Sequence, residues 1–276
     1  MMPPAPDSHP QAEEVWREYM TTGEMPEYVP TQWFERKLLR PLVKLLPKDP
    51  RCKVCLYPFK GIGGTLVRAF LGVAPSKLNP HLCNVCERAA NHFHGGAEIE
   101  VSMLFADVRG STGLAEHMSP AEFGQLIDRF YMATTRVLYS KNALVEKLIG
   151  DEVTGFFVPG FAGKNHARVA IEAGEEILHA IGYGSPTGPW LPVGVGVHYG
   201  IAFVGSVTSE GGAADITVLG DTANVGARLT SLAGAGEMMI SEAARQAANL
   251  DPGEMEMRKM ELKGRSDPLD VWIRKV

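Results

Sequence analysis

From residue 98 onward, apolar side chains recur with the two-residue period of strands and the 3.6-residue period of helices in a definite order. Strands are predicted over 98–108, 143–149, 153–158 and 193–198, with helices after 119 and over 164–181. This β-α-β-β-α-β order is that of a ferredoxin-like α+β sandwich. The fold class that we predict is therefore α+β, with a smaller helical and cysteine-containing module in front.

Turn and cap signals support this order. Ser119 and Glu122 form a capping box around Pro120, which marks a helix start. Gly150-Asp151 is a hairpin signal between the two middle strands. A second hairpin is expected through Tyr199-Gly200. Later strands are predicted over 201–207, 215–219, 238–241, 257–263 and 269–273, and helices over 221–232 and 242–249.

The composition is that of an ordinary globular chain and argues against two classes of protein. The 276 residues are 45% hydrophobic and 21% charged, which suits one large domain or two modest ones. With 27 Lys and Arg against 32 Asp and Glu, a basic nucleic-acid-binding protein is not expected. No apolar run approaches the roughly 18–20 residues of a spanning helix, and the start does not resemble a signal peptide. We therefore expect a cytoplasmic protein.

The composition shifts near His94-Gly95-Gly96, which we interpret as a domain boundary. The predicted division is a disordered tail over 1–10, N-terminal helices over 11–50, a four-cysteine metal-binding module over 51–96 and the α+β domain over 97–276. One of the helices, over 31–46, is amphipathic and basic. It could contact an anionic membrane, but we favour packing against the chain's own core or a dimer seam.

Two CxxC pairs, with 27 residues between them, predict a metal site. Its ligands are Cys52, Cys55, Cys83 and Cys86. Each pair can present two thiolates from one turn, and two turns complete a tetrahedral S₄ site for zinc. An iron–sulfur cluster uses the same ligands, and a redox disulfide is a third interpretation. His81, His92 and His94 could substitute as ligands.

Two aspartates follow strand ends and suggest a second metal site. Asp107 lies in FADVRGST after the first strand, and Asp151 lies at the tip of the first hairpin. If the hairpin flanks the first strand, the two carboxylates converge. Paired carboxylates are typical ligands of Mg²⁺ or Mn²⁺, which otherwise take phosphate oxygens and water.

A third segment, LGDTANVGAR, opens a predicted helix. Asn224 and Arg228 are four residues apart, so they share one face of that helix. The arginine offers a planar, permanently charged fork for phosphate oxygens.

Together these segments resemble the catalytic domain of the class III nucleotidyl cyclases. FADVRGST, EKLIGDE, VGVHYG and LGDTANVGAR occur in the family's order and spacing over about 99–276. The resemblance implies an adenylate cyclase that converts ATP to 3′,5′-cyclic AMP and pyrophosphate. It also implies a homodimer with active sites at the interface and two Mg²⁺ or Mn²⁺ ions in each.

The resemblance also implies a role for each matching residue. Asp107 and Asp151 would bind the metals, assisted by the Val108 carbonyl. Lys147 and Thr217 would read the purine base, a pair typical of a bacterial adenylyl subgroup.

Three further residues match the family's substrate contacts. Asn224 would position the ribose, Arg228 would stabilise the reacting phosphate, and Lys263 would bind the terminal phosphates. Two positions depart from the pattern: Gly194 stands where some members carry a pyrophosphate-binding arginine, and Ser111 replaces a common phenylalanine.

Two other functions remain open from the residues alone. The same chemistry on another base would make cyclic GMP or a cyclic pyrimidine nucleotide, although Lys147 with Thr217 favours adenine. The second open function is that of a cyclase homologue that binds nucleotide as a sensor without turnover. We interpret His198 as a packing residue, because a lone histidine in a strand is usually structural.

Overall fold

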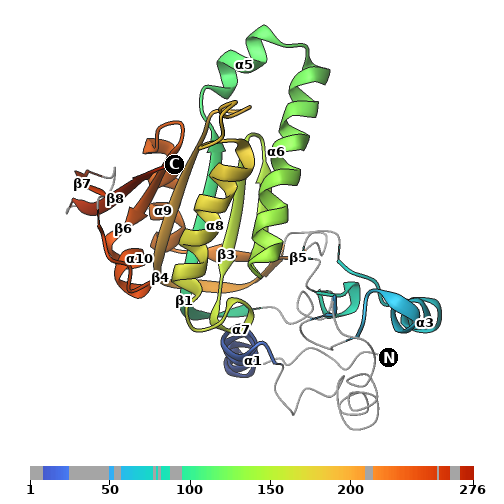
Figure 1. The fold of residues 1–276 in the computed structure, drawn as a ribbon. Coiled ribbons are helices and arrows are strands. Elements are labelled where there is room, and N and C mark those ends of the chain that lie inside the picture. Colours follow the sequence, from blue (N-terminus) through green and yellow to red (C-terminus); the bar gives the residue numbers. More distant parts are fainter. Residues whose placement is uncertain are drawn as a thin grey trace. The chain divides into compact units, whose positions relative to one another are not determined.

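The computed structural model describes residues 9–24, 50–52, 57–76, 79, 82–87, 95–208, 214–253, 255–261 and 268–276. The predicted helix over 31–46, Cys55 and Lys263 lie outside these residues, as does most of the predicted tail. The chain forms two compact units, one of Met1–Ile99 with Phe203–Val218 and one of Glu100–Ala202 with Leu219–Val276 (Figure 1).

The sheet has the strand order β2-β3-β1-β4-β6-β8-β7. Its strands are β1 (Gly95–Val108), β2 (Leu144–Ile149), β3 (Glu152–Phe157), β4 (Val193–Thr208), β6 (Glu237–Ser241), β7 (Glu256–Met260) and β8 (Leu269–Lys275). The first four in space, β2-β3-β1-β4, are in the order of a ferredoxin-like sheet. The predicted α+β fold and its β-α-β-β-α-β core are therefore confirmed.

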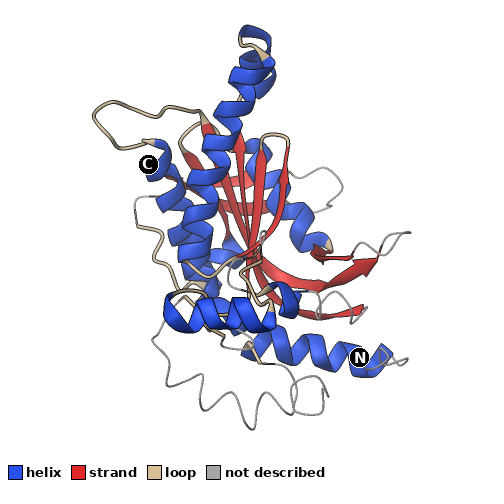
Figure 2. Ribbon diagram, turned by 90° about the vertical axis from the view of Figure 1, so that its right-hand side faces the viewer, coloured by secondary structure: helices blue, strands red, loops and turns tan. Residues whose placement is uncertain are grey.

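Helices cover both faces of this sheet (Figure 2). The Ser102 hydroxyl on β1 lies 3.0 Å from Nδ1 of His166, the first residue of α8 (His166–Ile181). Phe105, on the opposite face of the same strand, packs against Gly226 of α9 (Asp221–Leu232). Helix α6 (Pro120–Ser140) shares the face of α8 and begins with the predicted capping box.

The expected hairpin through Tyr199-Gly200 is wrong, because β4 continues through these residues as one strand. A Cβ at position 200 would lie 2.7 Å from the Thr222 hydroxyl oxygen. That hydroxyl donates to the carbonyl oxygen of Ile201 at 2.6 Å. Gly200 therefore allows α9 to pack closely against the strand, and it does not form a turn.

In the unit of Met1–Ile99 with Phe203–Val218, α1 (His9–Thr22) covers the beginning of β1. Arg17 donates to the carbonyl oxygen of Glu98 at 2.7 Å, and Trp16 and Tyr19 are buried. Helix α1 overlaps the predicted helix over about 11–21 but begins two residues earlier, at His9, inside the segment predicted as a tail. The unit also contains α3 (Gly61–Leu71) and β5 (Ala214–Leu219), which pairs with β4.

Short helices complete the described elements: α5 (Ser111–His117), α7 (Pro159–Ala162) and α10 (Glu242–Ala247). Among the described residues, no helix combines the length and the apolar character that crossing a bilayer requires.

Candidate active site

The two predicted metal-binding aspartates lie together at one end of the β1–β3 ladder. Asp107 pairs with Glu152 in the antiparallel register, and the Val108 amide donates to the Asp151 carbonyl oxygen at 3.1 Å. Gly150 adopts φ 61°, so the β2–β3 turn is tight enough to place Asp151 beside the end of β1. Both aspartates are half-buried.

Glu152 is a third carboxylate of this cluster that the sequence reasoning missed. Cross-strand partners point to the same face of a sheet, so its side chain lies beside that of Asp107. Burial raises the pKa of Glu152; a hydrogen bond from Thr154 opposes the shift, and the charge of Asp151 adds to it. The sequence signal that could have identified Glu152 is its position next to Asp151.

Arg109 supplies the positive charge that balances the cluster. Its guanidinium forms an ion pair with Asp107, and its Nη1 donates to the carbonyl oxygen of Ser231 at 3.1 Å. Burial lowers the pKa of Arg109, while the charges of Asp151 and Glu152 oppose that shift. The side chain thus connects the end of β1 with the last turn of α9.

Helix α9 carries Asn224 and Arg228 on one side, as the spacing predicts. Val225 and Leu229 are fully buried toward the core, whereas Asn224 is exposed and Arg228 is half-buried. The two polar side chains therefore lie on the side of the helix that turns away from the sheet. The contacts described for Asp107 come from β3 and Arg109, and not from these two residues.

The predicted base-reading residues belong to different units. Lys147 is exposed on β2, 3.7 Å from the carboxylate of its neighbour Glu146. Thr217 is buried on β5. Their pairing and the roles of the Val108 carbonyl and Lys263 stay predictions.

The two remaining sequence observations have structural explanations. A Cβ on Gly194 would lie 2.8 Å from the carbonyl oxygen of Ala233, so the backbone leaves no room for a side chain there. His198 is buried, with Nδ1 2.8 Å from the Ser241 hydroxyl, which fits a packing role.

Three of the four predicted cysteine ligands come together. Cys52, Cys83 and Cys86 are buried, and their sulfur atoms all lie within 4.8 Å of one another. The fourth, Cys55, lies outside the described residues.

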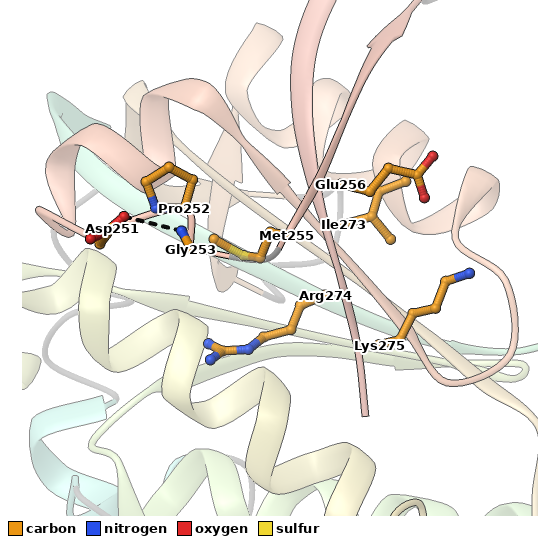
Figure 3. A pocket seen from close by; sticks show the side chains of 8 residues that line it. All are labelled: Asp251, Pro252, Gly253, Met255, Glu256, Ile273, Arg274 and Lys275. Carbon is orange, nitrogen blue, oxygen red and sulfur yellow. Dashed lines mark hydrogen bonds between the residues drawn. The ribbon is translucent and has the colours of Figure 1, made fainter.

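A cavity of about 520 Å³ lies beside β7 and β8 (Figure 3). Its lining residues are Asp251, Pro252, Gly253, Met255, Glu256, Ile273, Arg274 and Lys275. Its charged groups are largely engaged, since Arg274 pairs with Glu175 and Glu256 with Arg258. The predicted site residues that the structure describes do not line it.

Known proteins resemble this chain in sequence over about half of its length. An adenylate cyclase of Anabaena cylindrica is 28% identical over 138 residues, which cover 48% of this chain and 27% of that protein. An adenylate cyclase of Streptomyces coelicolor is 32% identical over 139 residues, covering 50% of this chain and 32% of the relative. The chain thus spans about a third or less of these relatives.

Solved structures show the same fold. The guanylyl cyclase Cya2 superposes with a TM-score of 0.59 and 25% identity, covering 65% of this chain and 93% of that one. The adenylyl cyclase CyaB from P. aeruginosa has a TM-score of 0.54 and 23% identity, covering 64% and 93%.

Residues 96–275 match the family described as the adenylate and guanylate cyclase catalytic domain. The match covers well over half of the chain and includes every element from β1 to β8. This chain therefore belongs to the family of class III adenylate and guanylate cyclase catalytic domains.

Proposed function

We propose that this protein is an adenylate cyclase, which converts ATP to 3′,5′-cyclic AMP and pyrophosphate in a homodimer. The observation that carries the proposal is the convergence of Asp107 and Asp151 at one end of the β1–β3 ladder. Family membership alone leaves the base open, because members are named adenylate and guanylate cyclases.

The carboxylate cluster fits divalent cations. Asp107 and Asp151 are half-buried, and Glu152 adds a third acidic group beside them. Hard ions such as Mg²⁺ and Mn²⁺ prefer these oxygen ligands and complete their shells with phosphate oxygens and water. When bound, two such ions would lower the pKa of the ribose 3′-hydroxyl and neutralise charge on the triphosphate.

The chain's own residues supply position and charge. In the reaction the ribose 3′-oxygen loses its proton to water or substrate and bonds to the α-phosphorus, while the bond to the pyrophosphate oxygen breaks. Catalysis of this kind depends mainly on positioning and charge stabilisation. Asn224 would hold the ribose, and Arg228 would donate to the α-phosphate oxygens where negative charge builds. Lys263 would bind the terminal phosphates.

The proposed base preference rests on Lys147 and Thr217. A lysine ammonium donates hydrogen bonds only, and a threonine hydroxyl both donates and accepts. This pair suits the N1 acceptor and the amino donor of adenine. Lys147 is exposed on β2, so it is accessible to a nucleotide.

The proposed dimer is supported by the position of Asn224 and Arg228 on one side of α9. That side turns away from the sheet, so a second chain can supply the aspartates that complete the site. The domain also has exposed apolar side chains, as expected of a protein whose surface a partner covers in part. They include Ile149, Ile201, Leu219 and Leu232, which are 45–66% exposed.

The proposal is tested by isosteric removal of the metal-binding charges. Asp107→Asn and Asp151→Asn should each lower Mn²⁺-dependent cyclic AMP formation by at least about a hundredfold, because an amide is a poor ligand for a hard ion. Asp128→Asn, a change at an exposed aspartate of α6, is the matched control and should leave the rate unchanged. Full activity in either test variant would refute the metal assignment.

A further inference from the structure

The buried cysteine cluster lies outside the residues that match the cyclase family. We propose that Cys52, Cys83 and Cys86 bind a single zinc ion in a closed structural site. The proposal rests on these three cysteines; the CxxC spacing makes Cys55, which lies outside the described residues, the sequence candidate for a fourth ligand.

The spacing of the sulfur atoms favours one ion over a cluster. A tetrahedral zinc ion with Zn–S bonds of about 2.3 Å holds its sulfur ligands about 3.8 Å apart. The three sulfur atoms lie within 4.8 Å of one another, so small side-chain adjustments bring all of them to one ion. In an iron–sulfur cluster, thiolates on different iron atoms lie on different corners and are farther apart than ligands of one ion.

Two backbone amides donate hydrogen bonds to sulfur atoms of the cysteine cluster. The Cys83 amide donates to Cys52 Sγ at 3.3 Å, and the Cys86 amide donates to Cys83 Sγ at 3.3 Å. Hydrogen bonds of this kind favour the charged form of the acceptor, and the thiolate is the form that binds metal. Zinc binding would release the thiol protons to solvent.

Each cysteine segment is held by its own backbone frame. Around the first, the Cys52 amide donates to the Tyr57 carbonyl oxygen at 3.0 Å, and Arg51 forms a β-bridge with Pro58. Around the second, the Asn84 amide donates to the carbonyl oxygen of Ala74 at 2.9 Å. The Asn84 side chain accepts from the Ala74 amide at 3.0 Å as well. Hydrogen bonds next to Cys52 and Cys83 therefore help to position both cysteine segments.

Burial indicates a structural role and not a catalytic one. Cys52 and Cys83 are fully buried and Cys86 is 6% exposed. A catalytic zinc keeps one position open to water or substrate, whereas these three cysteines have almost no contact with solvent. The ion would connect two segments 31 residues apart in a region whose described elements are short.

Metal analysis of the full-length protein tests the proposal without reference to turnover. We expect about one zinc per chain, and zinc-edge X-ray absorption with four sulfur neighbours. Iron with inorganic sulfide, or metal-free protein with a reversible disulfide, would overturn the proposal. These readouts fail or succeed independently of cyclase activity.

Variants identify the ligands. Cys83→Ser and Cys55→Ser should each lower zinc content severalfold and lower the melting temperature, because a hydroxyl is a poor replacement for a soft thiolate. His92→Ala is the control for an alternative ligand close by in the sequence and should keep its zinc. Loss of zinc in His92→Ala with retention in Cys55→Ser would contradict the four-cysteine set. If a variant does not fold, the sulfur count of the unmodified protein still decides the question.

Discussion

The backbone amide of Val108 donates a hydrogen bond to the carbonyl oxygen of Asp151 at 3.1 Å. This bond extends the β1–β3 ladder by one step beyond the pair of Asp107 and Glu152. Asp107, Asp151 and Glu152, which come from two segments 44 residues apart, thereby lie at one end of the sheet. The ladder, and not the side chains themselves, sets their separation.

A composite site between two chains predicts complementation. Asp107→Ala and Arg228→Ala should each be inactive alone, because one loses the metal ligand and the other the phosphate donor. In a mixed dimer, one of the two sites then carries both lesions and the other carries none. An equal mixture should recover about a quarter of the wild-type activity if chains exchange freely. Absence of recovery, with heterodimers demonstrated by tagged copurification, would place the whole site within one chain.

Arg109 should act as the internal counter-charge of the carboxylate cluster. Arg109→Ala removes the ion pair with Asp107 and the hydrogen bond to Ser231, so it should destabilise the fold by about 1–3 kcal/mol. Added Mn²⁺ should raise the melting temperature of this variant more than that of the wild type, because the carboxylates then lack another cation. Arg136→Ala, at an exposed residue of α6, serves as the control. Equal Mn²⁺ shifts in all three proteins would contradict the assignment.

The packing of α9 on β1 predicts a contrast between two glycines. A Cβ on Gly226 would overlap the ring of Phe105, so Gly226→Ala should cost about 1–3 kcal/mol of stability. Gly124, inside α6, has open space around it, and Gly124→Ala should be neutral or stabilising by up to about 1 kcal/mol. Urea unfolding of the two variants measures the difference. Similar effects from both would show that α9 does not pack as described.

The buried His166 predicts a loss of stability in acid. Burial lowers the pKa of His166 below its ordinary value of 6.5, against the raising effects of Glu100 and a backbone hydrogen bond. The unfolded chain therefore binds a proton first as pH falls, and the stability that the neutral ring contributes is lost below pH 6.5. Urea midpoints from about pH 8 to about pH 5.5 should fall more steeply for the wild type than for His166→Gln. His179→Gln, at an exposed position of α8, should keep the wild-type slope.

The strand and helix order could be predicted because each element carries its own local signal. The capping box at Ser119 and the Gly150 turn act within a few residues, and both are present. That Asp107 and Asp151 lie at the same end of the sheet could be predicted from the hairpin flanking the first strand. In contrast, the continuity of β4 depends on Gly200 meeting Thr222 of α9, a contact between separate elements of the chain.

Other features depend on tertiary contacts that no local pattern encodes. Arg109 joins the site through an ion pair and a carbonyl oxygen 122 residues away. Helix α3 begins in a glycine-rich segment whose composition argues for a loop. Gly64 lies against the backbone of Phe59, so a glycine that weakens the helix is required by packing.

Substrate choice is measured by incubating the purified protein with Mn²⁺ and ATP, GTP, CTP or UTP in separate reactions. Each product is identified by mass spectrometry. We predict cyclic AMP as the dominant product, formed together with pyrophosphate. Cyclic GMP or a cyclic pyrimidine nucleotide as the dominant product would contradict the role of Lys147 and Thr217. Bound nucleotide without any cyclic product would contradict catalysis itself and indicate a nucleotide sensor.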